Sequence, residues 1–376
     1  MLKALQEQMS MCVEFFHYSL RFENNIFVLN FDERTAVREL LGDLRVLHVS
    51  QILPLLCYPH APETETIFRS WTAKGCKFEY FQLPPEEAAL KEQAGAIRKA
   101  LAAQIIPVLA WVPAGSSVLT EEKRDTLALF CTKLFSATKL FFLGDYRGLE
   151  VAGQFYSHPN RQEIEGFLDG ARSINIGKGR LARLHAAKLE LTADLILLEA
   201  KAGALFQEIF THRGAGTLIS EDYPNVFRKA ELSDVLDISF IVNPYIKKGT
   251  ILPVSEDDIA ANIDNYYVFT VNNQIVATGM LAEYENAYEI GKICTLPRYQ
   301  RRGRAKSLVQ NMTEMARQRG KKFVFSLSIE PKMWVFFNQL GFTEVARESL
   351  PQSWQQHYDL ARPSRAFQLE LCSKPV

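Results

Sequence analysis

Short apolar runs alternate with amphipathic stretches along the first half of the chain. Four runs rich in Val, Ile, Leu and Phe predict buried strands, at residues 24–31, 44–50, 105–112 and 138–145. Helical patterns lie at residues 85–104 and 121–137, and a helix, a strand and a second helix are expected within residues 179–210. Strands that are apolar on both faces and separated by helices form mostly parallel sheets between helix layers. The first half therefore predicts a three-layer α/β/α domain.

The pattern changes at residues 212–224. Gly214, Gly216 and Pro224 predict a turn-rich connector there rather than a helix or a regular strand. The expected elements beyond it are a strand and a helix at 227–242, a β-meander at 266–296, a helix at 304–320, and a strand and a helix at 322–341. The second half therefore predicts a mixed α+β fold on a central sheet.

Single residues mark several element ends in this second half. Ser233 is placed to cap the first helix, Asn272-Asn273 to turn the meander, and Gly320 to end the long helix. We expect two domains, residues 1–215 and 216–376, since a chain of 376 residues holds about two domains of ordinary size.

Composition narrows the class of protein. The chain has 43 basic and 43 acidic residues, so its net charge of zero gives no overall attraction to nucleic acid or to an anionic membrane. No apolar run reaches the ~18–20 residues that a membrane-spanning helix needs. Six scattered cysteines without a CxxC pair predict reduced thiols and no metal site. Together with polar residues near the N-terminus where a signal peptide would be apolar, this predicts a cytoplasmic protein.

One loop carries the clearest chemistry. Gln300, Arg301, Arg302, Gly303, Arg304 and Ala305 lie between the last strand of the meander and the long helix. A glycine at such a turn lets the backbone approach a ligand, and the first amides of the next helix point outward without partners. The helix dipole and the arginines favour negative charge, so a pyrophosphate is the natural ligand. The alternative is a solvated basic turn.

The setting of this loop resembles the GNAT N-acetyltransferase fold, from roughly residue 225 to 371. The resemblance implies that the loop amides of Gln300–Ala305 hold the pyrophosphate of acetyl-CoA. It also implies that the strand ending at Thr295 and Leu296 splays from its neighbour and offers free backbone groups to the pantetheine arm. Pro297 suits the exit of that strand because proline removes a hydrogen-bond donor.

Flanking segments resemble a narrower family. Residues 203–219 and 350–365 look like the domain junction and the substrate-binding tail of bacterial-type N-acetylglutamate synthases. These proteins join an amino-acid-kinase-like domain to a GNAT domain. The resemblance implies acetyl transfer from acetyl-CoA to L-glutamate, the first step of arginine biosynthesis. It further implies arginine as an effector and a homo-oligomer, both through the first domain, with no nucleic-acid or membrane partner and no metal.

The same resemblance nominates catalytic residues on the strand before the loop. Glu289 stands where GNAT enzymes often carry a glutamate base that acts through water, and Lys292 where related synthases contact the glutamate acceptor. Strict alternation along a strand would aim these two side chains at opposite faces. Both can serve one site if the strand bulges between them, and Gly291 is the expected bulge position. The alternative is an exposed strand glutamate and a solvent-facing lysine.

Arg362 and Ser364 match the Arg-x-Ser of the family's carboxylate-binding tail. A guanidinium offers a bidentate fork to a carboxylate, and a hydroxyl adds a further donor, which suits a dicarboxylic amino acid. The alternative is a basic surface loop.

Several positions depart from the family pattern. Pro253 and Val254 stand where an arginine would anchor a further acceptor carboxylate, although Lys247 and Lys248 lie close in sequence. Phe337 stands where many GNAT enzymes have a tyrosine acid, so the thiolate is expected to leave unprotonated or to take its proton from water. Glu330 also replaces an asparagine of this motif.

The first half departs further. Amino-acid kinases hold ATP phosphates on glycine-rich turns after their first two strands, whereas the matching turns, residues 30–33 and 48–51, contain no glycine. Since the backbone cannot close on a phosphate there and Asp32 and Glu33 would repel it, we predict no kinase activity.

Three functions remain in competition. The first is an acetyl-CoA:L-glutamate N-acetyltransferase, and the second is a GNAT enzyme for another small amine or amino acid, which Pro253 and Val254 favour. The third is a non-catalytic regulator that binds acetyl-CoA or an amino acid. Four intact residues argue against the third, since a regulator has no need of all of them: Glu289, Gln300, Gly303 and Arg362.

Overall fold

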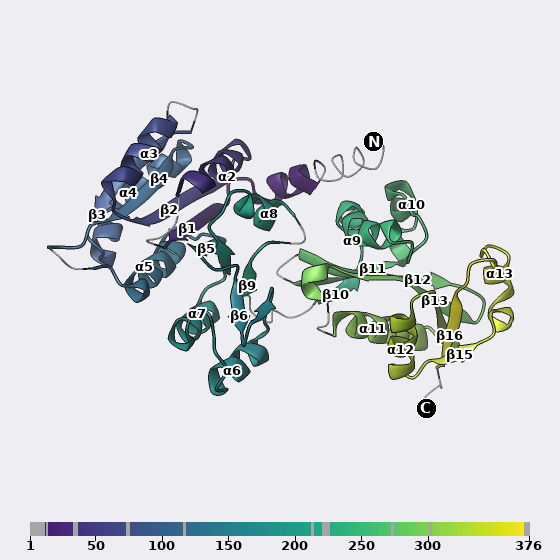
Figure 1. Cartoon of the computed structure of the whole chain (residues 1–376). Coiled ribbons are helices and arrows are strands. Elements are labelled where there is room, and N and C mark those ends of the chain that lie inside the picture. The colour runs from purple at the N-terminus through teal and green to yellow at the C-terminus, as the bar shows by residue number, and fades with distance from the viewer. Residues whose placement is uncertain are drawn as a thin grey trace. The chain divides into compact units, whose positions relative to one another are not determined.

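The computed structural model describes residues 12, 14–32, 37–72, 76–115, 118–211, 214–219, 226–271, 274–300 and 303–371. The chain divides into two compact units, residues 1–222 and 223–376. Within the described residues each unit is built on a sheet of seven strands (Figure 1).

The first sheet is mostly parallel. Its strands are β1 (Ile26–Phe31), β2 (Leu53–Pro59), β3 (Phe78–Leu83), β4 (Ile106–Trp111), β5 (Lys139–Gly144), β8 (Asp194–Glu199) and β9 (Thr217–Ile219). They lie in the order β3-β4-β2-β1-β5-β8-β9, and β9 alone of these runs antiparallel to its neighbour. A separate hairpin joins β6 (Leu149–Val151) to β7 (Gln154–Tyr156).

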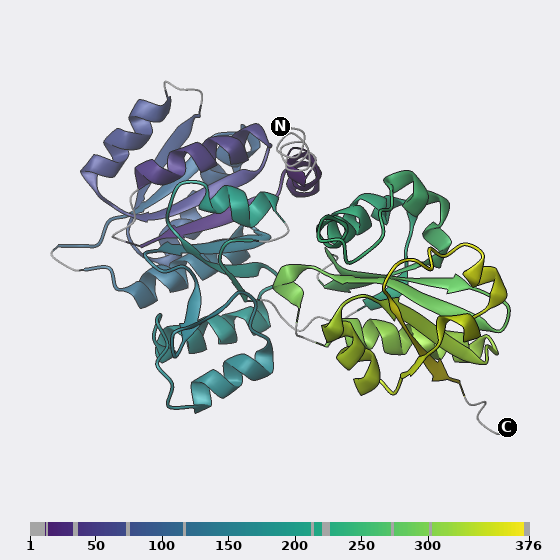
Figure 2. The same ribbon diagram turned by 45° about the vertical axis from the view of Figure 1, so that its right-hand side comes forward.

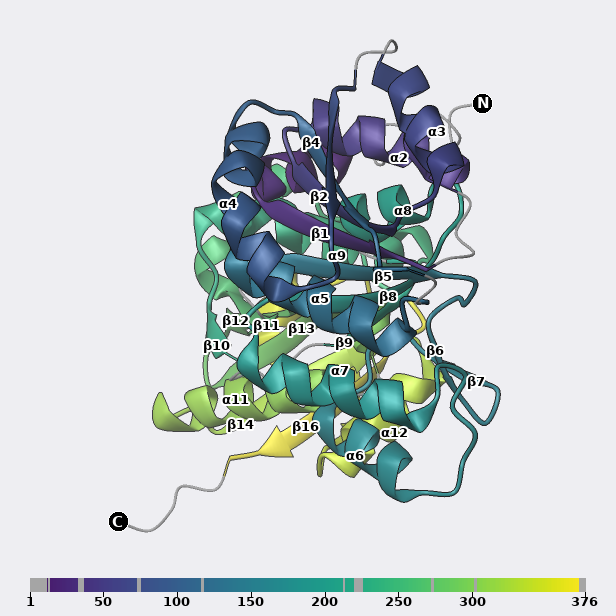
Figure 3. The same cartoon turned by 90° about the vertical axis from the view of Figure 1, so that its left-hand side faces the viewer.

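Helices cover both faces of this sheet (Figure 3). One layer consists of α2 (Val37–Val49), α3 (Pro62–Thr72) and α8 (Ala204–Phe210), and the other of α4 (Glu87–Ala102), α5 (Glu121–Leu134), α6 (Arg161–Asp169) and α7 (Lys178–Glu190). Strand β1 shows how the two cores form, because Phe27 and Leu29 pack toward the first layer and Val28 toward the second. The three-layer α/β/α prediction is confirmed.

Two local predictions for the first unit are wrong. Residues 44–49 belong to helix α2, whose buried Leu40, Leu44 and Leu47 follow helical spacing, and the second strand is instead Leu53–Pro59. The turn after the second strand is therefore not 48–51 but begins at His60, and His60-Ala61 also lacks glycine. The absence of kinase activity stays a prediction.

The predicted connector at 212–224 contains a strand. β9 pairs with β8 through Thr217↔Leu197 and its two neighbours, so the first sheet extends beyond the expected boundary at residue 215. Gly216 sets the approach of the two strands, because a Cβ there would lie 2.2 Å from the Leu197 carbonyl oxygen. The glycine marks a close backbone contact rather than the end of regular structure.

The second sheet is mostly antiparallel. Its strands are β10 (Val226–Lys229), β11 (Tyr266–Val271), β12 (Gln274–Glu283), β13 (Ala287–Thr295), β14 (Phe323–Ser328), β15 (Thr343–Val345) and β16 (Arg365–Glu370). Their order is β10-β11-β12-β13-β14-β16-β15, and β13 and β14 form its parallel pair.

Helices lie on both faces of this sheet too. They are α9 (Val235–Lys247), α10 (Glu256–Ala261), α11 (Arg304–Gln318), α12 (Pro331–Gln339) and the short α13 (Gln352–Gln355). Figure 2 shows α9 and α10 on one face and α11 and α12 on the other. Most apolar residues of these elements form one core cluster, and Trp354 of α13 packs in a smaller second cluster with Phe325. The predicted α+β fold on a central sheet is confirmed.

The element ends follow the prediction in part. Gly320, with a φ of 71°, follows α11, and the hydrogen bonds Lys321 N–H to Ala316 and Gly320 N–H to Arg317 complete the expected cap. Ser233 does not cap α9. It lies inside a 3₁₀ turn, and Asp234 precedes the helix and accepts two hydrogen bonds from Arg228. The turn residues Asn272-Asn273 lie outside the described residues.

Candidate functional site

Strands β13 and β14 part in the middle of the second sheet. They pair at three positions, from Ala287↔Phe323 to Glu289↔Phe325, and Ser326 Oγ donates to the Ile290 carbonyl at 2.6 Å. Beyond this point β13 continues to Thr295 with β12 on its other side. The edge of β13 that faces β14 is therefore open from Gly291 onward. The splay implied by the family resemblance is confirmed.

A cavity of about 570 Å³ lies beside the end of this open edge. Its lining includes five residues predicted for the cofactor: Thr295, Gln300, Gly303, Arg304 and Ala305. Gly303 precedes the first turn of α11 with a φ of 72°, a left-handed conformation that glycine adopts without strain. The first turn of a fifteen-residue helix, whose amides point toward its N-terminus, therefore faces the region where a phosphate is expected.

Of the other three predicted cofactor residues, two lie outside the described residues: Arg301 and Arg302. Leu296 is buried in the core and its amide donates to the Val276 carbonyl at 2.9 Å, so its side chain does not line this cavity.

The charged groups around this cavity are not equivalent. Arg304 is buried, its guanidinium lying 5.0 Å from the centre of the Tyr299 ring and donating to the Tyr299 carbonyl at 3.4 Å. Lys306 and Lys332 also line the cavity and add positive charge. A phosphate group would therefore meet helix amides and lysines as well as the basic loop.

Strand β13 bulges between the two predicted catalytic residues. Gly291 lies opposite Met280 and Cys294 opposite Thr278, so two residues of β13 face one residue of β12. The bulge was expected at Gly291, but the residue with positive φ is Lys292, at 49°. The extra residue resets the alternation, and Glu289 and Lys292 line one cavity of about 100 Å³. The geometric condition for a shared site is therefore met.

Glu289 lies in an environment that favours its neutral form. Burial raises the pKa of its carboxyl to about 7, while the nearby charge of Lys292 and hydrogen bonds from Tyr284 and Trp354 oppose the rise. Tyr284 Oη lies 3.4 Å from Glu289 Oε2. A carboxyl that titrates near neutral pH can accept a proton and pass it on, which is what a general base requires.

Lys292 is the cationic partner in this cavity. Burial lowers the pKa of its ammonium, and the carboxylate of Glu289 opposes that shift. The positive charge of Arg362 lowers the same pKa further, which places the guanidinium and the ammonium in one electrostatic environment. Two cations that face one small cavity favour an anionic ligand.

Arg362 and Ser364 line the same cavity from the C-terminal tail. Arg362 Nη2 donates to the carbonyls of Gly249 and Thr250, at 3.3 and 3.0 Å. Ser364 is buried, and its hydroxyl lies 2.9 Å from that of Tyr358. The structure thus brings together all four residues predicted for catalysis and acceptor binding.

A smaller cavity of about 90 Å³ lies between the other two. Its lining includes Tyr245, Lys292, Glu330 and Phe337. Phe337 is buried among aromatic rings, 5.4 Å from Phe342 between ring centres, and offers no proton. Tyr245 and Ile293 line both this cavity and the 570 Å³ one, so the two spaces meet along the open edge of β13.

Sequence reasoning did not single out four aromatic residues of this site. Tyr284 and Trp354 adjoin Glu289, Tyr358 adjoins Ser364, and Tyr245 donates a hydrogen bond to the open strand at Thr295. Tyr358 belongs to the tail segment that carried the family resemblance, so a signal for it existed. Tyr245 lies on α9, fifty positions from its strand partner, and no local pattern points to it.

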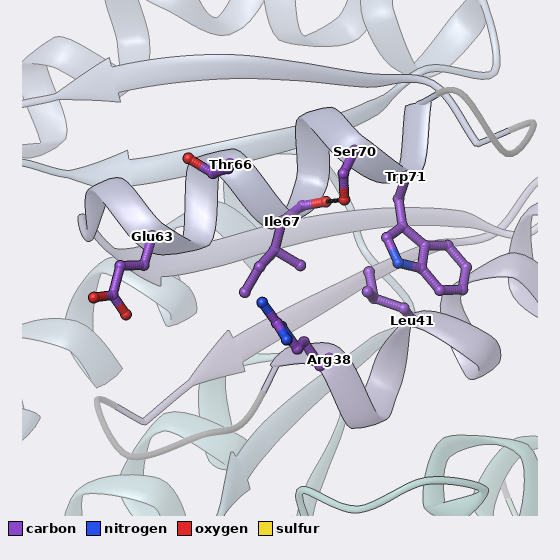
Figure 4. A pocket seen from close by; sticks show the side chains of 7 residues that line it. All are labelled: Arg38, Leu41, Glu63, Thr66, Ile67, Ser70 and Trp71. Carbon is purple, nitrogen blue, oxygen red and sulfur yellow. Dashed lines mark hydrogen bonds between the residues drawn. The ribbon is translucent and has the colours of Figure 1, made fainter.

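A larger cavity, of about 760 Å³, lies in the first unit. Figure 4 shows it between α2 and α3 of the first unit, with Arg38 and Leu41 on one wall and Ile67 and Trp71 on the other. Its charged residues, Arg38 and Glu63, are exposed. Since it contains none of the predicted site residues and no paired acid and base, size alone does not make it the active site.

Two further properties concern the described part of the chain. None of its helices combines the length and apolar character that crossing a membrane requires. Within the same residues, no group of three or more His, Cys, Asp and Glu side chains is arranged to hold a metal ion.

The chain is similar to known acetyltransferases. Residues 235–342 match the acetyltransferase (GNAT) family model. The amino-acid acetyltransferase of Pseudomonas putida (strain GB-1) is 28% identical over 239 residues, which cover 62% of this chain and 55% of that protein. That of Mannheimia succiniciproducens is 27% identical over 186 residues, covering 49% of this chain and 42% of that protein. The chain thus spans about half the length of the curated relatives it matches.

A solved structure is similar over both units. N-acetylglutamate synthase from Neisseria gonorrhoeae, complexed with coenzyme A and L-arginine, matches with a TM-score of 0.60 and 19% sequence identity. The match covers 96% of this chain and 99% of that one. The chain therefore has the fused fold of the N-acetylglutamate synthases, an amino-acid-kinase-like domain followed by a GNAT domain.

Proposed function

We propose that this protein is an N-acetyltransferase that moves the acetyl group of acetyl-CoA to the α-amine of L-glutamate. The observation that carries the proposal is the continuity of two spaces along the open edge of β13. One space ends at the N-terminus of α11, and the other is lined by Glu289, Lys292 and Arg362. The names of the matching relatives, amino-acid acetyltransferases, support the same reaction class.

The 570 Å³ cavity suits the cofactor. Its phosphates would lie at the glycine turn and the first amides of α11, where the backbone donates without competition from a side chain at Gly303. Its extended arm would run along β13, because an unpaired strand edge offers backbone donors and acceptors to an amide-bearing chain. This orientation directs the thioester toward the cavity of Glu289.

The transfer requires a neutral amine, and Glu289 is the proposed base. The amine of an amino acid is largely protonated at neutral pH, so a proton must leave before the nitrogen attacks the thioester carbonyl. Glu289 accepts that proton, directly or through one water. The carbon–nitrogen bond forms as the carbon–sulfur bond breaks, coenzyme A leaves as the thiolate, and the nitrogen gives up its second proton to solvent as the amide forms. Since Phe337 cannot supply a proton, the thiolate takes one from solvent.

The acceptor is proposed to be a dicarboxylic amino acid. Arg362, Ser364 and Lys292 converge on the 100 Å³ cavity and provide two cations and a hydroxyl for two carboxylates. The loop that carries Pro253 and Val254 contributes no cation to it, and Lys247 and Lys248 are exposed. Because that loop supplies no cation, a second candidate acceptor is another small amino acid.

The first unit is proposed to regulate and assemble the protein. The similar structure from Neisseria gonorrhoeae contains L-arginine, which supports arginine as an effector of this chain also. We place the homo-oligomer contact in the same unit.

A single assay tests the reaction and the acceptor together. The purified protein is mixed with acetyl-CoA and each of the twenty amino acids, and release of free thiol is followed. Glutamate is expected to give the highest kcat/KM. A clear preference for an uncharged amino acid would favour the second candidate, and no thiol release with any amine would contradict the proposal.

Arg362→Ala sharpens the assignment of the acceptor. Loss of one partner of a buried charge pair should lower kcat/KM for glutamate. The corresponding activation free energy should rise by about 2–5 kcal/mol. The loss should be much smaller for glutamine if the guanidinium binds the side-chain carboxylate. Equal losses on both substrates would remove Arg362 from that contact. Lys247→Ala, at an exposed lysine outside the cavity, is the matched control.

Gly303→Val tests the cofactor side separately. A β-branched residue is strained at a φ of 72°, so the turn must shift and the helix amides move from the phosphate. The dissociation constant for coenzyme A should rise by about tenfold or more, since misplacing charge-assisted hydrogen bonds costs ~1.5–3 kcal/mol each. An unchanged constant in calorimetry would contradict the cofactor assignment.

A further inference from the structure

Tyr245 lines both the 570 Å³ cavity proposed for the cofactor and the adjoining 90 Å³ cavity. Its hydroxyl is hydrogen-bonded to the open strand β13. It donates to the Thr295 carbonyl at 2.7 Å and accepts from the Thr295 amide at 3.2 Å. It also accepts from Gln300 Nε2 at 2.9 Å. A hydroxyl has one hydrogen to donate and two lone pairs to accept with, so every bonding position is used.

These contacts solve a problem that the splayed strand creates. On the side away from β12, the backbone of Thr295 has no neighbouring strand, because β14 has already diverged. Buried backbone groups without partners are costly, so they are nearly always satisfied in folded proteins. Here the Tyr245 hydroxyl takes both groups, and Gln300 Nε2 adds a second donor to the same carbonyl at 3.2 Å.

The same two backbone groups are what an extended, amide-bearing ligand would use. A chain that pairs with a strand edge offers its carbonyl to the strand's N–H and its own N–H to the strand's carbonyl. The phenol and the ligand amide therefore compete for Thr295. Both groups cannot be accommodated there at hydrogen-bonding distance.

We propose that Tyr245 is a plug on the open edge of β13, the strand along which the cofactor is proposed to bind. Its hydroxyl, with the Gln300 amide, closes the open edge of β13 in the free protein, and the amide-bearing arm of acetyl-CoA displaces it. This inference rests on the proposed function, which places acetyl-CoA in this cavity. The local structure permits the displacement, since Pro244 lacks an amide hydrogen and removes one helix hydrogen bond just before Tyr245.

Displacing the plug lowers the affinity for the cofactor and raises selectivity. Part of the binding free energy is used to break the contacts of Tyr245, so the observed affinity is below the intrinsic one. A ligand that lacks amides at the right spacing cannot replace those contacts. The plug also covers a strand edge that would otherwise be available for pairing with another chain.

Tyr245→Phe tests this directly. The ring is kept, but the free protein loses the bonds to Thr295 and Gln300, whereas the complex with coenzyme A loses none. The dissociation constant for coenzyme A, measured by calorimetry, should therefore fall by about 3- to 10-fold. Tyr266→Phe, a buried tyrosine of β11 that lines none of the three cavities of this unit, is the matched control and should not change the constant.

The outcomes separate the two proposals. If the wild-type protein does not bind coenzyme A, the proposed function fails. If the wild type binds but Tyr245→Phe binds equally or more weakly, the plug is wrong, and weaker binding would make the hydroxyl a cofactor contact.

Amide hydrogen exchange gives a second readout that needs no affinity. The Thr295 amide should exchange faster in free Tyr245→Phe than in the free wild type, because its acceptor has been removed. Coenzyme A should restore slow exchange in both proteins. Equal exchange in the two free proteins would overturn the plug.

Discussion

The two sheets of this protein differ at the positions where sheets of their kind usually bind ligands. In the first unit the connections from β1 and β5 lead to opposite sides of the sheet, and ligands of such sheets bind at the carboxyl ends of the strands at this switch point. Here the protein's own side chains fill the position. In the second unit, β13 and β14 diverge and leave a strand edge and three connected or adjoining cavities.

The side chains that occupy the switch point of the first sheet form an ion pair. Arg180, at the start of α7, donates to both carboxylate oxygens of Asp125 on α5, at 2.8 and 3.1 Å. Asn30 on β1 donates to the same carboxylate at 3.1 Å. All three side chains are buried. A guanidinium and a carboxylate that neutralise each other leave little charge for a ligand, whereas Lys292 and Arg362 of the second unit share a small cavity.

The comparison teaches that burial has different consequences in the two places. In the first unit Asp125 and Arg180 are permanent partners of opposite charge, so the pair contributes structure. In the second unit burial raises the pKa of Glu289 to about 7. Among the described residues, no cation lies at hydrogen-bonding distance from its carboxylate. A group held in an unfavourable charge state is characteristic of catalysis.

Replacing Glu289 by glutamine should have the largest effect of the changes considered. Loss of a general base should lower kcat by about 10²–10⁴-fold, with little change in either KM, because the amide cannot accept a proton. Stopped-flow or steady-state thiol release measures this. Glu344→Gln, at an exposed strand residue paired with Arg365, is the matched control. A kcat near that of the wild type would return Glu289 to a structural role.

The same substitution should stabilise the protein at alkaline pH. The folded pKa of Glu289 lies above the unfolded value of 4.5, so its contribution to stability is greatest below pH 4.5 and is lost as pH rises through about 7. At pH 8 Glu289→Gln should raise the free energy of unfolding by about 1–3 kcal/mol, and at pH 4 the gain should vanish. Denaturant titrations at the two pH values measure the difference.

Arg180→Met should have the next largest effect, on stability rather than on catalysis. It leaves the buried carboxylate of Asp125 without its cation, which typically costs about 3–5 kcal/mol. Guanidinium unfolding of the first unit measures this, and kcat per folded molecule should stay unchanged. Arg183→Met is the matched control, because Arg183 is one-third exposed and contacts Glu121 at 3.3 Å. A small loss for Arg180→Met would mean that the cluster does not hold the switch point closed.

The parts of the site that local sequence could predict are contiguous. Gln300 to Ala305 are consecutive in the sequence, and Glu289 and Lys292 lie three positions apart on one strand, so a motif and its neighbours were enough. The contacts that complete the site are long-range. Tyr245 reaches Thr295 across fifty positions, and Arg362 reaches Thr250 across 112. No periodicity encodes such contacts.

Other differences arise where two local rules compete. Residues 44–50 satisfy both an apolar-run rule and helical spacing, and the buried leucines of α2 show that the helical spacing decides. At the bulge, glycine is the residue that accepts positive φ most easily, yet Lys292 takes it. The physical reason is register: Gly291 is paired with Met280 of β12, so the extra residue of the bulge falls one position later.

Besides weakening the binding of the acceptor, Lys292→Met should give a smaller and more specific effect, a shift in the pH profile of kcat/KM. The ammonium of Lys292 lowers the pKa of Glu289, which burial raises. Methionine keeps most of the side-chain volume and removes the charge, so the pKa of Glu289 should rise further. The acid limb of kcat/KM, expected near pH 7 in the wild type, should move by about 0.5–1.5 pH units toward alkaline pH, as for other removed neighbouring charges.

The direction of that shift separates two roles of the lysine. If Lys292 only bound the acceptor carboxylate, its loss would raise KM for glutamate and leave the acid limb of kcat in place. If it also holds Glu289 ionised, the limb moves and activity at pH 9 recovers toward the wild-type value. Lys247→Met, at an exposed lysine outside the cavity, should leave the profile unchanged. A shift in that control would show that net charge, rather than the contact across the bulge of β13, sets the pKa of the base.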